Sequence, residues 1–276
     1  MNKMLLLLFL TLVVGFTSCE PEREDKENAA NEATATAVEE QTEETPWLQA
    51  ILQPVPEDIT YLMGRFDPSR HPDFTRIEAI YTNKTGIYLR KDAYEAFKRM
   101  HRDAANAGIV LKIISATRNF DAQKAIWEDK WTGKRQVDGV LLSPEVTDPE
   151  GRAKKILRYS SMPGSSRHHW GTDIDLNALN NEFFAAGEGQ VLYNWLLNNA
   201  ANYGFCQPYT AKGTFRPNGY EEEKWHWSFV PIAKPLTDLA RDSMSNEKIS
   251  GFLGHETAVS IGILENYILG VNPNCL

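Results

Sequence analysis

The central part of the chain carries the most regular patterns of apolar and polar residues. Residues 90–107 place apolar side chains at three- and four-residue spacing and end before Gly108, which predicts a helix. The apolar run 109–115 predicts a buried strand. Residues 120–130 predict a second helix, for which Asn119 is a candidate N-cap.

The second half of the chain repeats this mixture of elements. Residues 190–203 predict a helix that ends at Gly204, and residues 253–269 predict a final apolar helix. Residues 172–176 and 224–230 alternate with a period of two, which is typical of strands.

Two stretches are interrupted by Pro and Gly. Residues 51–90 predict turns and short extended pieces, and residues 131–165 predict an irregular insertion that crosses the surface. Because the helices do not alternate regularly with the strands, we expect an α+β fold. It should hold a small, mostly antiparallel sheet flanked by helices.

The amino terminus predicts export. Residues 1–18 contain Lys3 and an apolar run that is too short to span a membrane but fits a secretory signal. Cys19 follows Phe-Thr-Ser, which resembles the acylation site of bacterial lipoproteins. We expect residues 1–18 to be a lipoprotein signal peptide and Cys19 to anchor the exported protein in a membrane, facing the periplasm or cell surface. The alternative is an ordinary signal peptide with Cys19 incidental.

Charge separates the next segment from the rest of the chain. Residues 20–45 contain ten acidic and two basic residues. The net charge of this segment is therefore -8, which equals the formal net charge of the whole chain. We interpret residues 19–45 as an acidic disordered tether and residues 46–276 as the folded domain. Since the folded part is nearly neutral, we expect no nucleic-acid partner, and we expect a monomer.

Two further cysteines, Cys206 and Cys275, remain in this exported chain. An even pair in an oxidising compartment favours a disulfide, and two buried free thiols are the alternative.

The most informative residues for function surround a short segment before the strand 172–176. His168 lies seven residues before Asp175, and Glu223 and His226 follow about fifty residues later. Two imidazoles and a carboxylate can fill three corners of a zinc tetrahedron and leave the fourth to water. Glu223 would then be a base beside that water. The adjacent His169 competes with His168 for the ligand role.

Strand alternation places these residues on a common face. If the strands 172–176 and 224–230 pair, Asp175 and His226 can converge on one side of the sheet. His168 would reach that point from the preceding loop, where Gly171 permits a tight turn. Asp173 shares the face of Asp175 and either orients a ligand imidazole or is a solvated strand residue.

Three motifs then resemble a known family. Residues 163–175 read Pro-Gly-Ser-Ser-Arg-His-His-Trp-Gly-Thr-Asp-Ile-Asp. This string resembles the P-G-x-S-x-H-x-x-G-x-A-x-D signature of the D-alanyl-D-alanine carboxypeptidase/dipeptidase family of zinc peptidases, of the VanY and VanX type. Residues 223–226 match its E-x-W-H element, and residues 115–118 resemble its S-x-x-R element. The resemblance covers roughly residues 88–230. Asp173 stands where the family prefers Ala, and the segment 131–165 is long.

The resemblance implies a hedgehog/DD-peptidase-like fold with one zinc ion per chain, held by His168, Asp175 and His226. It implies that Glu223 is the general base. Arg118 would stabilise the oxyanion or hold the substrate carboxylate, and Ser166 would help to bind substrate. Gln123, within the predicted helix 120–130, is a further candidate for the wall of the substrate pocket.

The function that follows is hydrolysis of the terminal D-Ala from peptidoglycan stem peptides by metal-activated water. Alternatives with the same metal centre are an L,D-carboxypeptidase and a peptidoglycan endopeptidase. A non-catalytic, zinc-containing cell-wall-binding lipoprotein is the alternative from another class, and there the retained Glu223 would have no purpose.

Overall fold

The computed structural model describes residues 46–142 and 146–276. The predicted signal peptide, the predicted acylation site Cys19 and the predicted acidic tether lie outside the described residues. None of the helices in the described ranges is long and apolar enough to cross a membrane.

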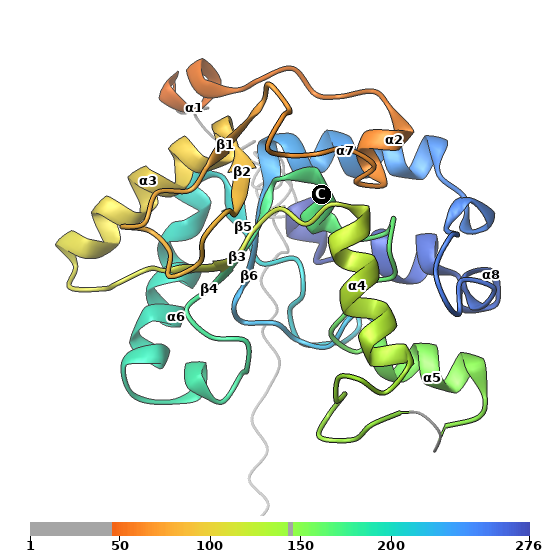
Figure 1. The fold of residues 1–276 in the computed structure, drawn as a ribbon. Coiled ribbons are helices and arrows are strands. Elements are labelled where there is room, and N and C mark those ends of the chain that lie inside the picture. The colour runs from red at the N-terminus through yellow and green to blue at the C-terminus, as the bar shows by residue number, and fades with distance from the viewer. Residues whose placement is uncertain (1–45, 143–145) are drawn as a thin grey trace, which may run out of the picture. The chain divides into compact units, whose positions relative to one another are not determined.

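A four-stranded antiparallel sheet forms the centre of the fold (Figure 1). Its order is β3 (Ile113–Ser115), β4 (Asp173–Leu176), β6 (His226–Phe229) and β5 (Phe205–Cys206). Every residue of β4 and β6 is buried, because these two strands lie between their neighbours and are covered on both faces. A second sheet pairs β1 (Phe74–Arg76) with β2 (Tyr88–Arg90). The predicted α+β fold with a small antiparallel sheet is confirmed.

Helices flank the sheet on either side. In Figure 1, α3 (Lys91–Asn106) and α6 (Gly187–Asn199) lie to the left of the sheet. On the right lie α4 (Phe120–Trp131), α5 (Pro149–Ile156) and α8 (Thr257–Ile261). The remaining α-helices are α1 (Pro46–Ile51), α2 (Ile59–Leu62) and α7 (Val230–Ser243).

The helices predicted at residues 90–107 and 120–130 are confirmed as α3 and α4. In α3 the apolar stripe is buried, and Phe97 and Met100 are fully covered. At the start of α4, the Asn119 side chain accepts a hydrogen bond from the amide of Ala122 at 2.9 Å.

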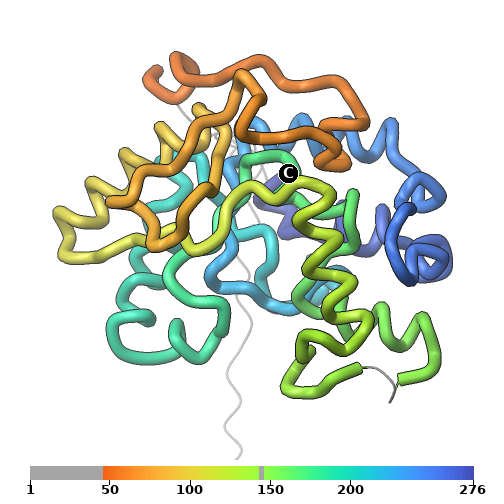
Figure 2. Tube along the Cα trace, in the orientation of Figure 1, coloured from red at the N-terminus to blue at the C-terminus, as the bar shows by residue number. Residues whose placement is uncertain are grey.

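The prediction of an irregular surface insertion at 131–165 is confirmed for residues 132–142, which form turns and are mostly exposed, but it is wrong for residues 149–165. Asp148 caps α5 by accepting hydrogen bonds from two amides of its first turn, and Pro149 occupies the first helical position, which requires no donor. The chain then returns to the sheet beside α4 (Figure 2), so that residues 160–165 are buried. This segment therefore contributes to the interior and not only to the surface.

The carboxyl-terminal third also differs from the prediction. The sequence pattern gave no signal for α7, which begins directly after β6 and contains Pro231 in its first turn and Pro235 within it. The expected helix 253–269 is divided at Gly262, whose φ of 69° ends α8 before a separate π-helical turn at Leu264–Ile268.

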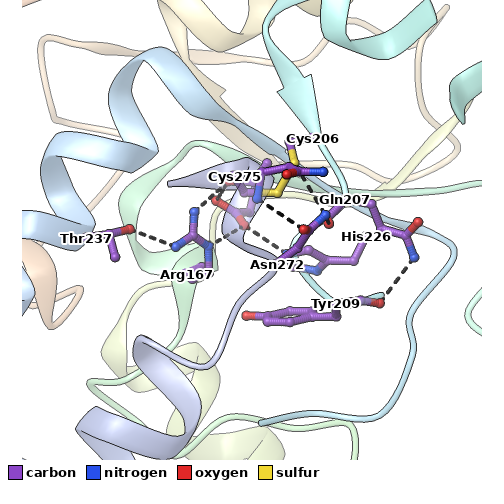
Figure 3. The surroundings of a disulfide bond; sticks show 11 residues. Arg167, Cys206, Gln207, Tyr209, His226, Thr237, Asn272 and Cys275 are labelled. Atoms are coloured by element: carbon purple, nitrogen blue, oxygen red, sulfur yellow. Dashed lines mark hydrogen bonds and ion pairs between the residues drawn. A yellow bond between two sulfur atoms is a disulfide. The ribbon is translucent and has the colours of Figure 1, made fainter. Parts of the chain in front are cut away.

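A disulfide joins Cys206 of β5 to Cys275, with 5.6 Å between the two Cα atoms (Figure 3). Of the two alternatives left by the sequence, the disulfide is the correct one. Beside it, the Asn272 side chain donates to the carbonyl of Gln207 at 3.1 Å. The last residues are thereby fixed against the edge strand of the sheet.

Candidate metal centre

The register between β4 and β6 creates the core of the site. Asp175 lies directly opposite His226 in the antiparallel ladder, so their side chains leave the sheet on the same face. An oxygen of Asp175 lies 3.0 Å from Nδ1 of His226. The pairing expected from strand alternation is confirmed.

His168 reaches the same point from a 3₁₀ turn, Arg167–Trp170, that precedes β4. Gly171 ends this turn with a φ of 72°, and a Cβ there would lie 2.4 Å from the ring of Phe74. Only glycine therefore fits. Nε2 of His168 lies 3.3 Å from Asp175, and the rings of His168 and His226 stand almost perpendicular with centroids 4.7 Å apart.

The three side chains meet as a donor set for a metal ion. One ligand atom from each of His168, Asp175 and His226 lies within 4.8 Å of the others, and all three residues are buried. Among the described residues this is the one group of three or more such side chains with that geometry. Two imidazole nitrogens and a carboxylate oxygen match the usual donors of zinc.

The outer nitrogens of both rings are held by acceptors, which determines the tautomers. Nδ1 of His168 donates to the carbonyl of Ala116 at 2.8 Å, and Nε2 of His226 bonds to Asp173 at 2.8 Å. Nε2 of His168 and Nδ1 of His226 are therefore the nitrogens that face Asp175. Such outer partners fix ring orientation in metal sites, so the residues fit a bound cation.

Electrostatics at His226 also favour positive charge at this place. Burial by itself lowers the pKa of the imidazole, but hydrogen bonds and charge interactions with Asp173 and Asp175 outweigh it and raise the pKa to about 9. Without a metal, a proton on Nδ1 occupies the position that a metal ion would take.

Asp173 is not a solvated strand residue but is fully buried. Burial raises the pKa of its carboxyl, yet the charge of Arg167 and the hydrogen bond with His226 lower it well below its usual range. Nε of Arg167 lies 3.2 Å from Asp173, and the same guanidinium donates to the hydroxyls of Ser228 and Thr237 (Figure 3). The additional acid, where the family prefers Ala, thus has its own counter-ion.

Glu223 comes from the turn before β6 and points at the open side of the donor set. Its Oε2 lies 3.6 Å from Nδ1 of His226, and its amide donates to the carbonyl of Tyr209 at 2.9 Å. The side chain is buried, although it belongs to an acidic run that would ordinarily be solvated. Burial raises the pKa of Glu223 to about 8, against the lowering effect of His226.

Arg118 lies between β3 and α4, and its amide donates to the carbonyl of His168 at 3.1 Å. Its guanidinium is 3.8 Å from Asp175 and donates to the hydroxyl of Ser115 and the amide oxygen of Gln123. Gln123 is buried and donates in turn to the carbonyl of Ser161 at 2.8 Å. Gln123 therefore holds Arg118 in addition to lining the site.

His169 turns away from the donor set, which resolves its competition with His168. Burial lowers the pKa of His169 to about 3, so the ring is neutral. Its Nε2 accepts from the amide of Gly164 at 3.0 Å, and Nδ1 donates to the carbonyl of Arg118 at 2.6 Å. The ring joins two segments of the site and contacts no other candidate ligand.

The donor set, Glu223, Arg118 and Gln123 line a pocket of about 470 Å³. The hydroxyl of Ser166 is buried in its wall and has no hydrogen-bond partner among the described residues, so it is available to a ligand. All the residues that the sequence predicted for the site line this pocket: Arg118, Gln123, Ser166, His168, Asp175, Glu223 and His226.

Other residues of the pocket wall gave no sequence signal. Tyr209 packs on His226 with ring centroids 4.7 Å apart (Figure 3), but it stands in a segment with no periodic pattern. Trp225, within the predicted strand 224–230, is buried and also lines the pocket. Lys130 and Ser160 belong to segments whose approach depends on the path of the chain after α5.

The family model for VanY, D-alanyl-D-alanine carboxypeptidase, matches residues 86–232, which include every element of the site. The chain belongs to the VanY family of carboxypeptidases. This membership agrees with the resemblance carried by the three motifs.

Individual relatives are more distant. The chain is 30% identical over 159 residues to YodJ of Bacillus subtilis (strain 168), which is named as a carboxypeptidase. This match covers 55% of this chain and 50% of that protein. It is 23% identical over 181 residues to a D-alanyl-D-alanine carboxypeptidase of Enterococcus faecium, covering 65% of this chain and 49% of the relative. The chain thus spans about half the length of these curated relatives. Among solved structures, the LdcB LD-carboxypeptidase gives a TM-score of 0.46 at 22% identity, covering 74% of this chain and 81% of that one.

Proposed function

We propose that this VanY-family protein is a zinc-dependent carboxypeptidase that removes the terminal D-Ala from peptidoglycan stem peptides. One observation carries the proposal. His168 and His226 are fixed by outer acceptors so that their free nitrogens face Asp175, and Glu223 stands beside that group with a buried carboxyl. A closed structural zinc site has no need of such a base.

His168, Asp175 and His226 would hold the zinc ion, which when bound lowers the pKa of water and polarises a carbonyl. Glu223 takes the proton of the attacking water and returns it to the leaving amine. Oε2 of Glu223 lies 3.6 Å from Nδ1 of His226, so the carboxylate is close enough to the proposed metal position to transfer this proton.

Arg118 supplies positive charge next to this centre. Its guanidinium is fixed by Ser115 and Gln123, so little reorganisation is required when charge develops on the substrate oxygen. Ser166 offers a buried hydroxyl that no described residue occupies, which suits a hydrogen bond to the substrate.

The test is digestion of defined stem peptides by the full-length, zinc-loaded protein, with products identified by mass spectrometry. We expect pentapeptide stems to lose a terminal D-Ala, and a chelator to abolish the reaction. The Glu223→Gln variant should retain zinc and lose activity by roughly 10²–10⁴-fold. Cleavage of tetrapeptide stems or cross-links instead would assign the L,D-carboxypeptidase or endopeptidase alternative. Uncut substrates with bound zinc would overturn the proposal.

We also propose that residues 1–18 are a lipoprotein signal peptide, that Cys19 anchors the protein in a membrane, and that residues 19–45 tether a domain formed by residues 46–276. The support is the lipoprotein-like sequence before Cys19 and the acidic composition after it. Replacement of Cys19 by Ala should move the protein from the membrane fraction to the soluble exported fraction. Retention in the membrane would exclude acylation of Cys19 as the anchor.

A further inference from the structure

The wall of the pocket formed by α4 carries a second cation beyond Arg118. Gln123, Ile126 and Lys130 all line the pocket, and their spacing of three and four residues places them on one face of the helix. The amine of Lys130 donates to the hydroxyl of Ser160. The family motifs include neither residue.

In the ranges 46–142 and 146–276, no carboxylate oxygen lies within 4.0 Å of the amine of Lys130. Glu223 and Asp138 act on this amine from a longer distance, and the acids near this wall have closer partners. Glu223 lies 3.6 Å from His226. Asp138 pairs with Arg158, and Asp129 lies 3.9 Å from Arg135. Glu182 lines the same pocket but is exposed at its rim. A partly buried ammonium without a close counter-ion is costly unless a ligand supplies the negative charge.

Burial of the Lys130 amine disfavours its charged form. Burial, with smaller contributions from Arg135 and Arg118, lowers the pKa of Lys130 to about 8. The amine is therefore still mostly protonated at neutral pH, and a bound anion would stabilise that charged form.

We infer that the amine of Lys130 and the hydroxyl of Ser160 form a subsite for a carboxylate of the peptide substrate. The inference deepens the proposed carboxypeptidase function and rests on it. Because Ser160 accepts from Lys130, its own hydroxyl proton is free to donate. A carboxylate can then take one hydrogen bond from each group.

The anchoring of the two cations indicates which carboxylate fits. Gln123, which holds Arg118, bonds to the carbonyl of Ser161, and Lys130 bonds to the side chain of Ser160. Lys130 lines the same pocket as Arg118 and the donor set. In a carboxypeptidase substrate, the terminal carboxylate lies one residue beyond the scissile carbonyl, about 3.8 Å between Cα positions. Because it is the acid nearest to the scissile bond, the terminal carboxylate is favoured over an acidic side chain further along the peptide.

Binding measurements on full-length, zinc-loaded protein test the subsite independently of turnover. In a Glu223→Gln background, which prevents cleavage, calorimetry would compare three peptides: the natural stem, the same stem with a carboxy-terminal amide, and a stem whose acidic side chain is replaced by a neutral one. Adding Lys130→Gln keeps a donor for Ser160 but removes the charge. The matched control is Lys134→Gln, which changes an exposed lysine outside the pocket.

We expect Lys130→Gln to weaken binding of the natural stem about 10- to 100-fold, as for a hydrogen bond to a charged group. The amidated stem should bind equally to the background and to the variant, Lys130→Arg should restore most of the affinity, and Lys134→Gln should change nothing. A loss that disappears with the neutral side chain instead would assign the subsite to the side-chain carboxylate. Equal loss on all three peptides, or no loss, would overturn the inference. If the protein bound but never cut the stems, the proposed function alone would fail.

Discussion

Asp173 accepts a hydrogen bond from Nε2 of His226 at 2.8 Å, on the edge of the ring opposite to Asp175. The same carboxylate pairs with the buried guanidinium of Arg167. One aspartate therefore orients a candidate ligand and neutralises a buried cation, and these two roles can be separated.

Replacement of Asp173 by Ala should affect both roles. Arg167 would be left buried without a counter-ion, which should lower the free energy of unfolding by roughly 3–5 kcal/mol. Loss of the acceptor for His226 should weaken zinc binding by roughly 10- to 100-fold. Urea denaturation and competition with a zinc chelator measure the two effects.

The double variant Asp173→Ala/Arg167→Met is the matched comparison. It should regain much of the stability, because no charge remains unpaired, but zinc binding should stay weak. Full recovery of zinc affinity in the double variant would show that Asp173 does not orient His226.

Gly171→Ala should disrupt the turn that presents His168. The added Cβ would lie 2.4 Å from Phe74 at a φ of 72°, so backbone strain and overpacking together should cost roughly 2–5 kcal/mol. Gly108→Ala is a close control, because Gly108 has a φ of 76° but open space around it. It should cost only about 1–2 kcal/mol and leave zinc binding unchanged. Equal losses of stability and zinc affinity in both variants would contradict the crowding argument.

The buried carboxyl of Glu223 predicts a pH dependence of the metal-free protein. Its pKa is raised by burial to about 8 in the folded state, above the ordinary value of 4.5. The folded state therefore holds this proton more tightly than the unfolded state. The resulting stabilisation is fully present below about pH 4.5 and is lost as the pH rises through about 8.

Glu223→Gln removes this titration, so in chelator the variant should gain stability relative to the native protein between pH 5 and pH 9. Denaturant unfolding at several pH values measures the difference between the two proteins. A difference that is constant with pH would exclude a raised pKa at Glu223.

The disulfide Cys206–Cys275 closes a loop across 69 residues of sequence. Replacement of both cysteines by Ser should lower the free energy of unfolding by about 2–4 kcal/mol. The effect should extend to the site, since Gln207, next to Cys206, donates to the carbonyls of Tyr209 and Glu223. We expect faster hydrogen exchange around residues 205–209 in the variant, and unchanged exchange in α3 serves as the internal control.

Several features of the site were accessible from the sequence because they depend on local geometry. The period of two in β4 and β6 put Asp175 and His226 on one face. The position of Gly171 after His168 indicated a tight turn, and Asn119 marked the start of α4. The spacing of the family signature favoured His168 over His169. Local geometry did not, because adjacent residues of a turn differ only in where their side chains find partners.

The sequence by itself determined α3, α4, the strands that carry Asp175 and His226, and the residues with the chemistry of a metal-dependent peptidase, because periodicity, capping and motif spacing act over a few residues. The tertiary structure decided what depends on segments far apart in the chain. In the folded protein, Asp173 pairs with Arg167. The ring of His169 bonds to the backbone of Gly164 and Arg118. The segment after α5 packs beside α4, where Lys130 donates to Ser160. The physical reason is that the burial of a charge and the identity of its partner are properties of packing, which no local pattern encodes.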